Sequence, residues 1–277
     1  GYRFSSANSI NIGRLVPQIV YYVYAYTQLL KRNEIKSGEK VNFVVPTGNF
    51  GNILAAYYAK RMGLPVGKLI CASNENKVLY DFFRTGIYDR NREFVLTISP
   101  SMDILVSSNL ERLIYHISGE DTQKTGELMQ ALNNGGRYEI SVDMKSNLED
   151  FCGGFATISE TREAILKVYN ETGYVMDTHT AVAEGVFEKY YKNEIDPSKT
   201  VIVSTASPYK FSESVLEAIG IKDIPEDDFE QAKLLEEISN TPIPNAVNEL
   251  KTAEIRHSRV CDAGAMRSEV EKILKII

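Results

Sequence analysis

The sequence has few of the residues on which disulfide-rich and metal-binding proteins depend. Only three cysteines occur among 277 residues, at Cys71, Cys152 and Cys261, and none is part of a CxxC pair. An odd number of widely separated cysteines argues against a disulfide framework and against a zinc site. We therefore expect no metal site, and this sparing use of cysteine favours the reducing cytoplasm as the location.

The sequence also lacks an excess of positive charge and a long apolar run. It has 31 basic and 37 acidic residues, a net charge of −6, and its Lys and Arg are scattered rather than grouped. A nucleic-acid-binding surface is therefore not expected. The most apolar stretch, residues 15–30, contains proline and several polar residues, so it predicts a buried helix and no membrane span.

What the sequence does contain is the hydrophobic content of a folded protein, 43%. A short β-branched run at 40–46 predicts a buried strand, 68–72 predicts another strand, and segments 52–60 and 76–85 predict helices. This alternation predicts an α/β fold with a parallel sheet and crossover helices. A third buried strand is expected at 200–204, a short strand at 138–142, and further helices at 12–32, 102–117, 120–134, 159–171, 180–192, 212–219 and 264–276.

The most informative segment is the turn Pro46-Thr47-Gly48-Asn49-Phe50-Gly51-Asn52, which joins the first predicted strand to a helix. The start of a helix exposes free N–H groups, and glycines let the backbone approach an anion closely. Neither GxxxxGK[ST] nor GxGxxG is present, so a single phosphate is a better ligand than a triphosphate or a dinucleotide. From the turn alone, an empty strand-to-helix turn with an asparagine cap is an equally good interpretation.

Three other segments place polar side chains where a ligand could bind. Thr205 follows the third strand and could bind a ring nitrogen, and Arg14 opens an apolar helix and could hold a phosphate. The alternatives are a capped turn for Thr205 and a surface position for Arg14. His179 precedes a helix, and a hydrogen-bonded structural role is favoured for it over a catalytic one. Segments 72–76 and 99–113 are interpreted as loops with polar caps that begin helices.

Seven segments together resemble threonine synthase, in the order in which that family has them. They are NSINIGR (8–14), VPTGNFGN (45–52), YYAKRMGLP (57–65), ASNEN (72–76), SPSMDILVSSNLERL (99–113), DTHTAV (177–182) and STASPYKF (204–211). The family consists of fold-type II enzymes that depend on pyridoxal 5′-phosphate (PLP). They convert O-phospho-L-homoserine and water into L-threonine and phosphate, the last step of threonine biosynthesis.

The resemblance implies the fold and the roles of individual residues. The fold would be tryptophan synthase β-like, a parallel sheet with helices on both faces. Residues 1–277 would form its C-terminal, large-domain portion, with a helical segment at about 222–277. Thr205 would bind the pyridine nitrogen of PLP, where a neutral hydroxyl does not enforce ring protonation. The residues expected to hold the PLP phosphate through backbone amides are Gly48, Asn49, Phe50 and Gly51. The candidates for binding the substrate phosphate are Asn8, Ser9, Arg14 and Asn52.

The chain departs from the family at several positions. Ser207 and Tyr209 stand where many members have His and Ala, and some members have an acid in place of Asn52. The family's Schiff-base lysine, in a Phe-Lys-Asp context, and its Thr-Ser-Gly-Asp-Thr-Gly-type loop for the substrate carboxylate lie upstream and are absent from these 277 residues.

Because the chemistry needs that amine, we expect no catalytic residue in this chain and no turnover by it alone. The chain begins with Gly1 rather than Met, and we expect it to be truncated. Its expected partner is then the missing N-terminal part of the same polypeptide. The loss of that part should leave an apolar face exposed, with aggregation or dimerisation as the result.

Two other hypotheses remain open. The chain could be a non-catalytic phosphate- or PLP-binding module that has lost the lysine, although Arg14, the 46–52 turn and Thr205 argue against long disuse. It could also be another fold-type II enzyme, such as a cysteine synthase or a threonine dehydratase. Those enzymes often have a Ser at the ring nitrogen and do not share the 99–113 stretch.

Overall fold

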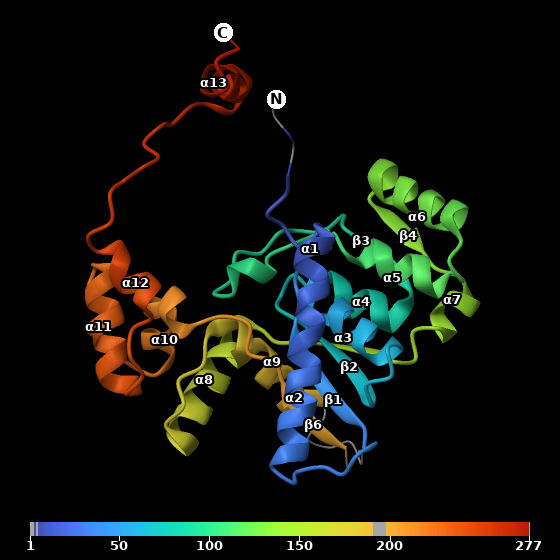
Figure 1. Cartoon of the computed structure of the whole chain (residues 1–277), viewed down its shortest axis with the longest axis horizontal. Coiled ribbons are helices and arrows are strands. Elements are labelled where there is room, and N and C mark those ends of the chain that lie inside the picture. The colour runs from blue at the N-terminus through green and yellow to red at the C-terminus, as the bar shows by residue number, and fades with distance from the viewer. Residues whose placement is uncertain (1–2, 4, 191–197, 277) are drawn as a thin grey trace. The chain divides into compact units, whose positions relative to one another are not determined.

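The computed structural model describes residues 3, 5–190 and 198–276 (Figure 1). It consists of two compact units, Gly1–Thr241 and Pro242–Ile277. The first contains the sheet and every segment that resembles the family. The second contains α12 (Asn245–Leu250), a 3-10 turn (Ala263–Ala265) and α13 (Met266–Ile273). Within the described residues, no helix is both long and apolar enough to cross a membrane.

The first unit is built on a four-stranded parallel sheet with the strand order β5–β2–β1–β6. Its strands are β1 (Val41–Pro46), β2 (Val66–Ser73), β5 (Phe151–Phe155) and β6 (Lys199–Ile202). Every residue of β1 is buried, as expected for a central strand of a parallel sheet that is covered on both faces. The predicted α/β class with a parallel sheet is confirmed.

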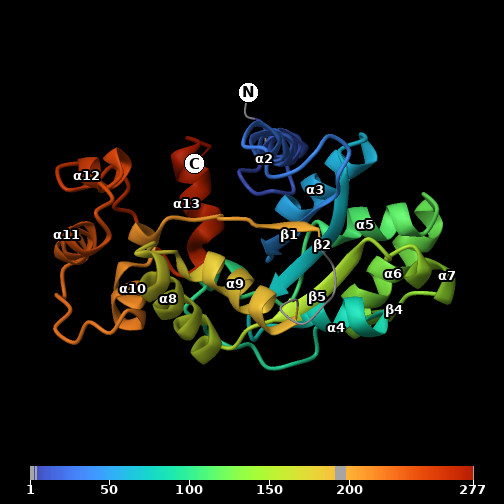
Figure 2. The ribbon, with the colours of Figure 1, turned by 90° about the horizontal axis from the view of Figure 1, so that it is seen from below.

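Successive residues of β1 pack against helices on opposite faces of the sheet. On one face, Phe43 joins the large core cluster, to which α2 (Ile19–Lys31) and α3 (Gly51–Arg61) contribute. On the other face, Val44 packs in a second cluster with residues of α9 (Thr178–Tyr190). Figure 2 shows the strands between these two helical layers.

Further elements of the first unit surround this core. The helices are α1 (Ile12–Leu15), α4 (Val78–Thr85), α5 (Leu110–Ile117), α6 (Thr122–Gly135), α7 (Val142–Ser146), α8 (Ile158–Thr172), α10 (Ser212–Ala218) and α11 (Asp228–Ser239). A separate antiparallel pair is formed by β3 (Ile87–Asp89) and β4 (Arg137–Glu139). The left-handed Gly86 ends α4, as its position after the helical pattern predicts.

The predicted helix at 102–117 is wrong over its first half, and only α5 is helical there. Residues 103–109 are irregular, because their side chains form hydrogen bonds to neighbouring loops. Asp103 accepts a hydrogen bond from Thr97, and Ser107 donates one to the Gly48 carbonyl. Such side-chain bonds offer the backbone an alternative to the helix.

Predictions for the other elements need smaller corrections. The helix predicted at 12–32 contains a 3-10 turn at Val16–Gln18, because Pro17 cannot continue the hydrogen-bond ladder. The strand predicted at 138–142 ends at Glu139, and Val142 already belongs to α7. The end of the helix predicted at 180–192 lies outside the described residues.

The two edge strands of the sheet differ most from the prediction. The third strand was expected to be buried through residue 204, but β6 is a half-exposed edge strand that ends at Ile202. The other edge, β5, is not predicted, because Gly153 and Gly154 in its centre lack the β-branched side chains by which strands are recognised.

Candidate functional site

The predicted cradle is a tight turn between β1 and α3. Phe50, the residue before the helix, has a left-handed backbone with φ 63°. This conformation is costly for a residue with a side chain, and the packing of the ring holds it in place. The Phe50 ring is 1% exposed and lies 6.0 Å from the Phe83 ring and 5.9 Å from the Phe151 ring. The turn is therefore anchored from the core side.

The turn lines a small cavity at the start of α3. The cavity has a volume of about 150 Å³ and is lined by Ser9 and by residues 46–53. Within the described residues, the backbone N–H groups of residues 49–53 donate to no protein acceptor. Free N–H groups and the positive end of the helix dipole together favour an anion at this point.

Two glycines keep this region open. A Cβ on Gly48 would lie 2.6 Å from the Ser101 carbonyl oxygen, closer than real Cβ contacts. A Cβ on Gly51 would lie 3.0 Å from the Cβ of Ser9. Any other residue at Gly48 would displace the Ser101 loop, so the close approach of the two backbones explains the glycine.

Residues of the 99–113 stretch support the cradle from behind. The Ser107 hydroxyl donates to the Gly48 carbonyl at 2.7 Å. The side-chain amide of Asn109 donates to the Asn49 carbonyl at 2.8 Å and to the Ser9 hydroxyl at 3.1 Å. These bonds occupy the carbonyl groups of the turn and leave its N–H groups free. The residues of this stretch by themselves predict only helix caps, but its specific resemblance to the family indicates a larger role.

The structure brings only part of the predicted substrate-binding set to the cavity. Ser9 lines the cavity, but Asn8 uses its side-chain oxygen locally, to accept from the Ile10 N–H and the Ser9 hydroxyl. Arg14 lies on α1 with an exposed side chain, and it is not among the residues that line the cavity.

Asn52 does line the cavity, and its amide has a defined orientation. Its Oδ1 accepts a hydrogen bond of 2.7 Å from the hydroxyl of Tyr22. Burial raises the pKa of Tyr22 far above its usual value, so this hydroxyl remains a donor. The Asn52 NH₂ group is thereby left to donate, as an anion in the cavity would require.

Thr205 follows β6 at the same edge of the sheet as the cradle. β6 runs parallel to β1, and the Val203 N–H donates to the Val44 carbonyl. The carboxyl ends of parallel strands meet at one edge, so Thr205 and the cradle share that edge. Thr205 is exposed, and its contact with a ring nitrogen stays a prediction.

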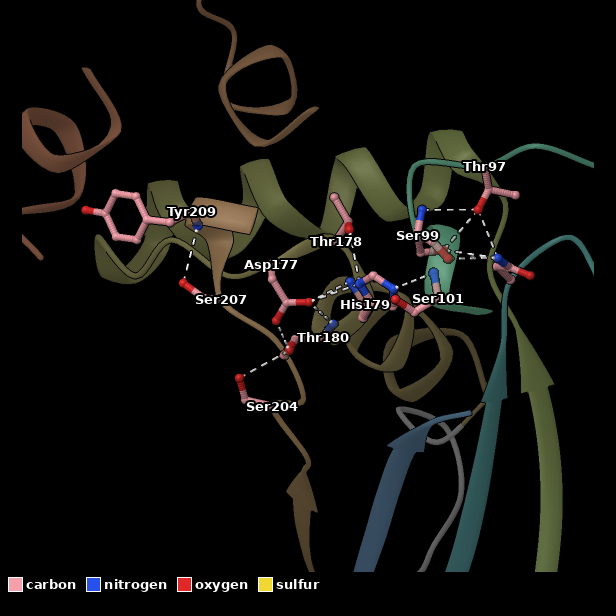
Figure 3. Close-up of polar contacts among 11 residues, drawn as sticks. Thr97, Ser99, Ser101, Asp177, Thr178, His179, Thr180, Ser204, Ser207 and Tyr209 are labelled. Carbon is pink, nitrogen blue, oxygen red and sulfur yellow. Dashed lines mark hydrogen bonds and ion pairs between the residues drawn. The ribbon is translucent and has the colours of Figure 1, made fainter. Parts of the chain in front are cut away.

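A buried polar cluster lies at the start of α9 (Figure 3). The Asp177 carboxylate accepts from the N–H groups of His179 and Thr180, at 2.8 and 3.1 Å, and from the Thr180 hydroxyl. Burial by itself would raise the pKa of Asp177, but the hydrogen bonds from His179 and Thr180 outweigh it, so the pKa lies below its usual value. Asp177 therefore caps α9 as a carboxylate, and the predicted structural role of His179 agrees with its burial, 4% exposed.

The chain is similar to known proteins in both sequence and fold. The family described as "Threonine synthase, C-terminal" matches residues 180–273. The protein named threonine synthase-like 1 from Macaca fascicularis is 42% identical over 282 residues, which cover 99% of this chain and 37% of that protein. Threonine synthase of Saccharomyces cerevisiae is 38% identical over 233 residues, covering 79% of this chain and 45% of the yeast protein.

Two solved structures share the fold. PLP-bound threonine synthase from Brucella melitensis matches with a TM-score of 0.73 and 36% identity, over 86% of this chain and 48% of its own. Threonine synthase from yeast matches with a TM-score of 0.80 and 32% identity, over 98% of this chain and 54% of its own. The chain thus spans between 37% and 54% of the length of these relatives.

The parallel sheet and its helical layers define a member of the fold-type II class of PLP-dependent enzymes. Within that class, the chain is similar to the threonine synthases, as its motifs predict.

Proposed function

We propose that the chain supplies the phosphate cradle and the ring-nitrogen contact for PLP in a threonine synthase. The observation that carries the proposal is the cavity of about 150 Å³ at the start of α3. It offers the free N–H groups of residues 49–53, a position at Gly48 that excludes a Cβ, and a tightly packed one at Gly51. These are the donors and the close approach that a single phosphate needs. When bound, PLP would act as an electron sink for the reaction.

The proposed reaction converts O-phospho-L-homoserine and water into L-threonine and phosphate, by cleavage of a carbon–oxygen bond. Substrate phosphate would be held by Asn52 and Ser9 beside the cradle, with Asn8 and Arg14 on the adjoining N-terminal segment. The lysine that binds PLP and the loop that holds the substrate carboxylate would come from the rest of the polypeptide. The proposed location is the cytoplasm.

Phosphate release from O-phosphohomoserine by the intact polypeptide tests the reaction. We expect release that depends on added PLP, and no release by the 277-residue chain alone, which should bind PLP weakly and without a covalent bond. If borohydride reduction fixed PLP to a lysine of this chain, the proposal that the PLP-binding lysine lies in the rest of the polypeptide would be wrong. If the intact polypeptide bound PLP but released no phosphate, a non-catalytic binding module would be the better interpretation. If it bound no PLP, the whole proposal would fail.

The substitution Arg14→Gln tests the substrate-phosphate role separately. The guanidinium is expected to bind the phosphate of the substrate and to leave PLP untouched. KM for O-phosphohomoserine should rise about tenfold, while PLP affinity stays unchanged. The matched control is Arg84→Gln on α4, whose side chain is 65% exposed and pairs only weakly with Asp81, at 3.7 Å. An unchanged KM in Arg14→Gln would remove this residue from the substrate site.

A further inference from the structure

The cluster at the start of α9 has a feature that a helix cap does not require. The His179 Nε2 accepts a hydrogen bond of 3.2 Å from the backbone N–H of Ser101. An N–H group can only donate, so Nε2 carries no proton and the neutral ring has its proton on Nδ1. Nδ1 faces the Asp177 carboxylate at 3.5 Å and the Thr178 hydroxyl at 3.4 Å, an orientation that fixes this tautomer.

Through Ser101, this histidine reaches the back of the phosphate cradle. The Ser101 carbonyl is the group that a Cβ on Gly48 would meet at 2.6 Å. Figure 3 shows His179 pointing from α9 toward Ser101. The ring also packs against Phe211, with centroids 4.7 Å apart, so its position is fixed on both sides. A shift of His179 would therefore move the loop on which the Gly48 turn rests.

The same helical turn also reaches the segment that carries Thr205. The Thr180 hydroxyl bonds to Asp177 and lies 3.3 Å from the hydroxyl of Ser204, the residue before Thr205 (Figure 3). Asp177 is 1% exposed and accepts hydrogen bonds from both His179 and Thr180. One buried carboxylate thus joins the support of the cradle to the loop after β6.

We propose that Asp177, His179 and Thr180 are positioning residues that fix the distance between the phosphate cradle and Thr205. This inference rests on the proposed function, in which one PLP molecule is held at its phosphate by the cradle and at its ring by Thr205. The two contacts are made by segments that follow different strands, the cradle after β1 and Thr205 after β6. Because PLP is rigid, both can be made at once only when their separation matches its length. Shifts of about 1 Å at such supports are enough to weaken a site.

The test measures dissociation constants for two probes, inorganic phosphate and PLP, in the intact polypeptide. Inorganic phosphate needs only the cradle, whereas PLP needs both contacts. In His179→Leu, both probes should bind about tenfold more weakly, since the Ser101 loop loses its acceptor. In Thr180→Val, phosphate affinity should stay unchanged and only PLP affinity should fall, about tenfold. His179→Gln supplies an oxygen near the position of Nε2 and should restore binding to within about threefold of wild type.

Two controls distinguish an effect on positioning from an effect on protein stability. All variants are measured well below their melting temperatures. The matched control is His116→Leu on α5, which also removes an imidazole ring that packs against aromatic side chains, here two tyrosines. Wild-type affinities in folded His179→Leu would overturn the inference while leaving the proposed function intact. Equal losses in His179→Leu and His179→Gln would also overturn it, because packing would then explain them. If wild type bound neither probe, the proposed function would fail, and this inference with it.

Discussion

At the scale of single residues, Gly48 is the position where the cradle and its supporting loop come closest. In Gly48→Ala, the new methyl group would collide with the Ser101 carbonyl, and one of the two backbones would have to shift. Overpacking of this kind costs about 1–3 kcal/mol. We therefore expect PLP and phosphate to bind at least about tenfold more weakly, as measured by isothermal titration calorimetry.

A glycine with free space provides the control for that substitution. Gly126 lies within α6, and a Cβ there would meet nothing within 4 Å. Gly126→Ala should stabilise the helix by up to about 1 kcal/mol and leave both affinities unchanged. Normal phosphate binding in Gly48→Ala would show that the close approach at Gly48 is unrelated to the anion.

The lowered pKa of Asp177 predicts that the stability of the folded protein depends on pH. Its pKa is lower in the folded protein than in the unfolded chain, so the folded state favours the carboxylate. The stability that this provides is complete above the unfolded pKa, about 3.9, and is lost as the pH falls through the lower folded value. Asp177→Asn should therefore be less stable than wild type at neutral pH, by about 1–2 kcal/mol.

Urea unfolding of both proteins from about pH 7 to about pH 2 measures that difference. The difference in free energy of unfolding between wild type and Asp177→Asn should disappear only at the acid end of the range. The control is Asp227→Asn at the start of α11, which removes the charge from a similar cap that accepts from the N–H groups of Phe229 and Glu230, at an exposed site. If that difference in free energy stayed constant to the lowest pH, the claim that the charge of Asp177 stabilises the folded state would be contradicted.

At the scale of elements, the contact of β5 with α9 leaves no room for a side chain on the strand at Gly154. A Cβ on Gly154 would collide with Val186 and Tyr190 of α9. Gly154→Ala should therefore lower the free energy of unfolding by about 1–3 kcal/mol, although alanine is otherwise preferred to glycine in a strand. Chemical denaturation measures the change, and Gly135→Ala at the end of α6, which has free space, is the control. If Gly154→Ala left the free energy of unfolding unchanged, the strand and the helix would be able to move apart at little cost.

The two glycines of β5, Gly153 and Gly154, show why some elements escape prediction. The central strand β1 was predictable, because its β-branched run satisfies propensity and burial together. β5 was not, because the close approach of α9 explains Gly154 and that of α4 explains Gly153. Both are tertiary contacts. The helix prediction fails over the irregular 103–109 segment for a related reason. Its polar side chains bond to loops that are distant in sequence, such as the carbonyl of Gly48.

The candidate site was predictable only in part. The backbone donors at Gly48 to Gly51 follow from the strand–turn–helix pattern and from the resemblance to the family. The supports of that turn, Ser107 and Asn109, come from a segment about sixty residues later, with separations of 59 and 60 positions. No local pattern marks such partners, because their role depends on how the loops pack.

At the scale of the whole molecule, an apolar stripe on the outer face of α1 and α2 stands out. Ile12 lies on α1, Val16 in the 3-10 turn that follows it, and Val20 and Tyr24 on α2, at intervals of four residues, and all four side chains are exposed. Their exposed fractions are 54%, 49%, 63% and 63%. A continuous exposed apolar surface of this kind is typical of a contact surface rather than of a solvent-facing helix. We therefore expect the 277-residue chain by itself to self-associate through this stripe.

Sedimentation velocity over a range of concentrations tests this expectation. The double substitution Val16→Lys and Val20→Lys should shift the chain toward monomer, because each lysine would bring a charge into the contact. Since both positions are exposed, the free energy of unfolding should change by less than about 1 kcal/mol. Leu96→Lys is the matched control, an apolar residue that is 81% exposed outside the stripe, and it should leave association unchanged. A monomeric wild-type chain, or equal association of the double variant, would show that the stripe does not mediate contacts between copies.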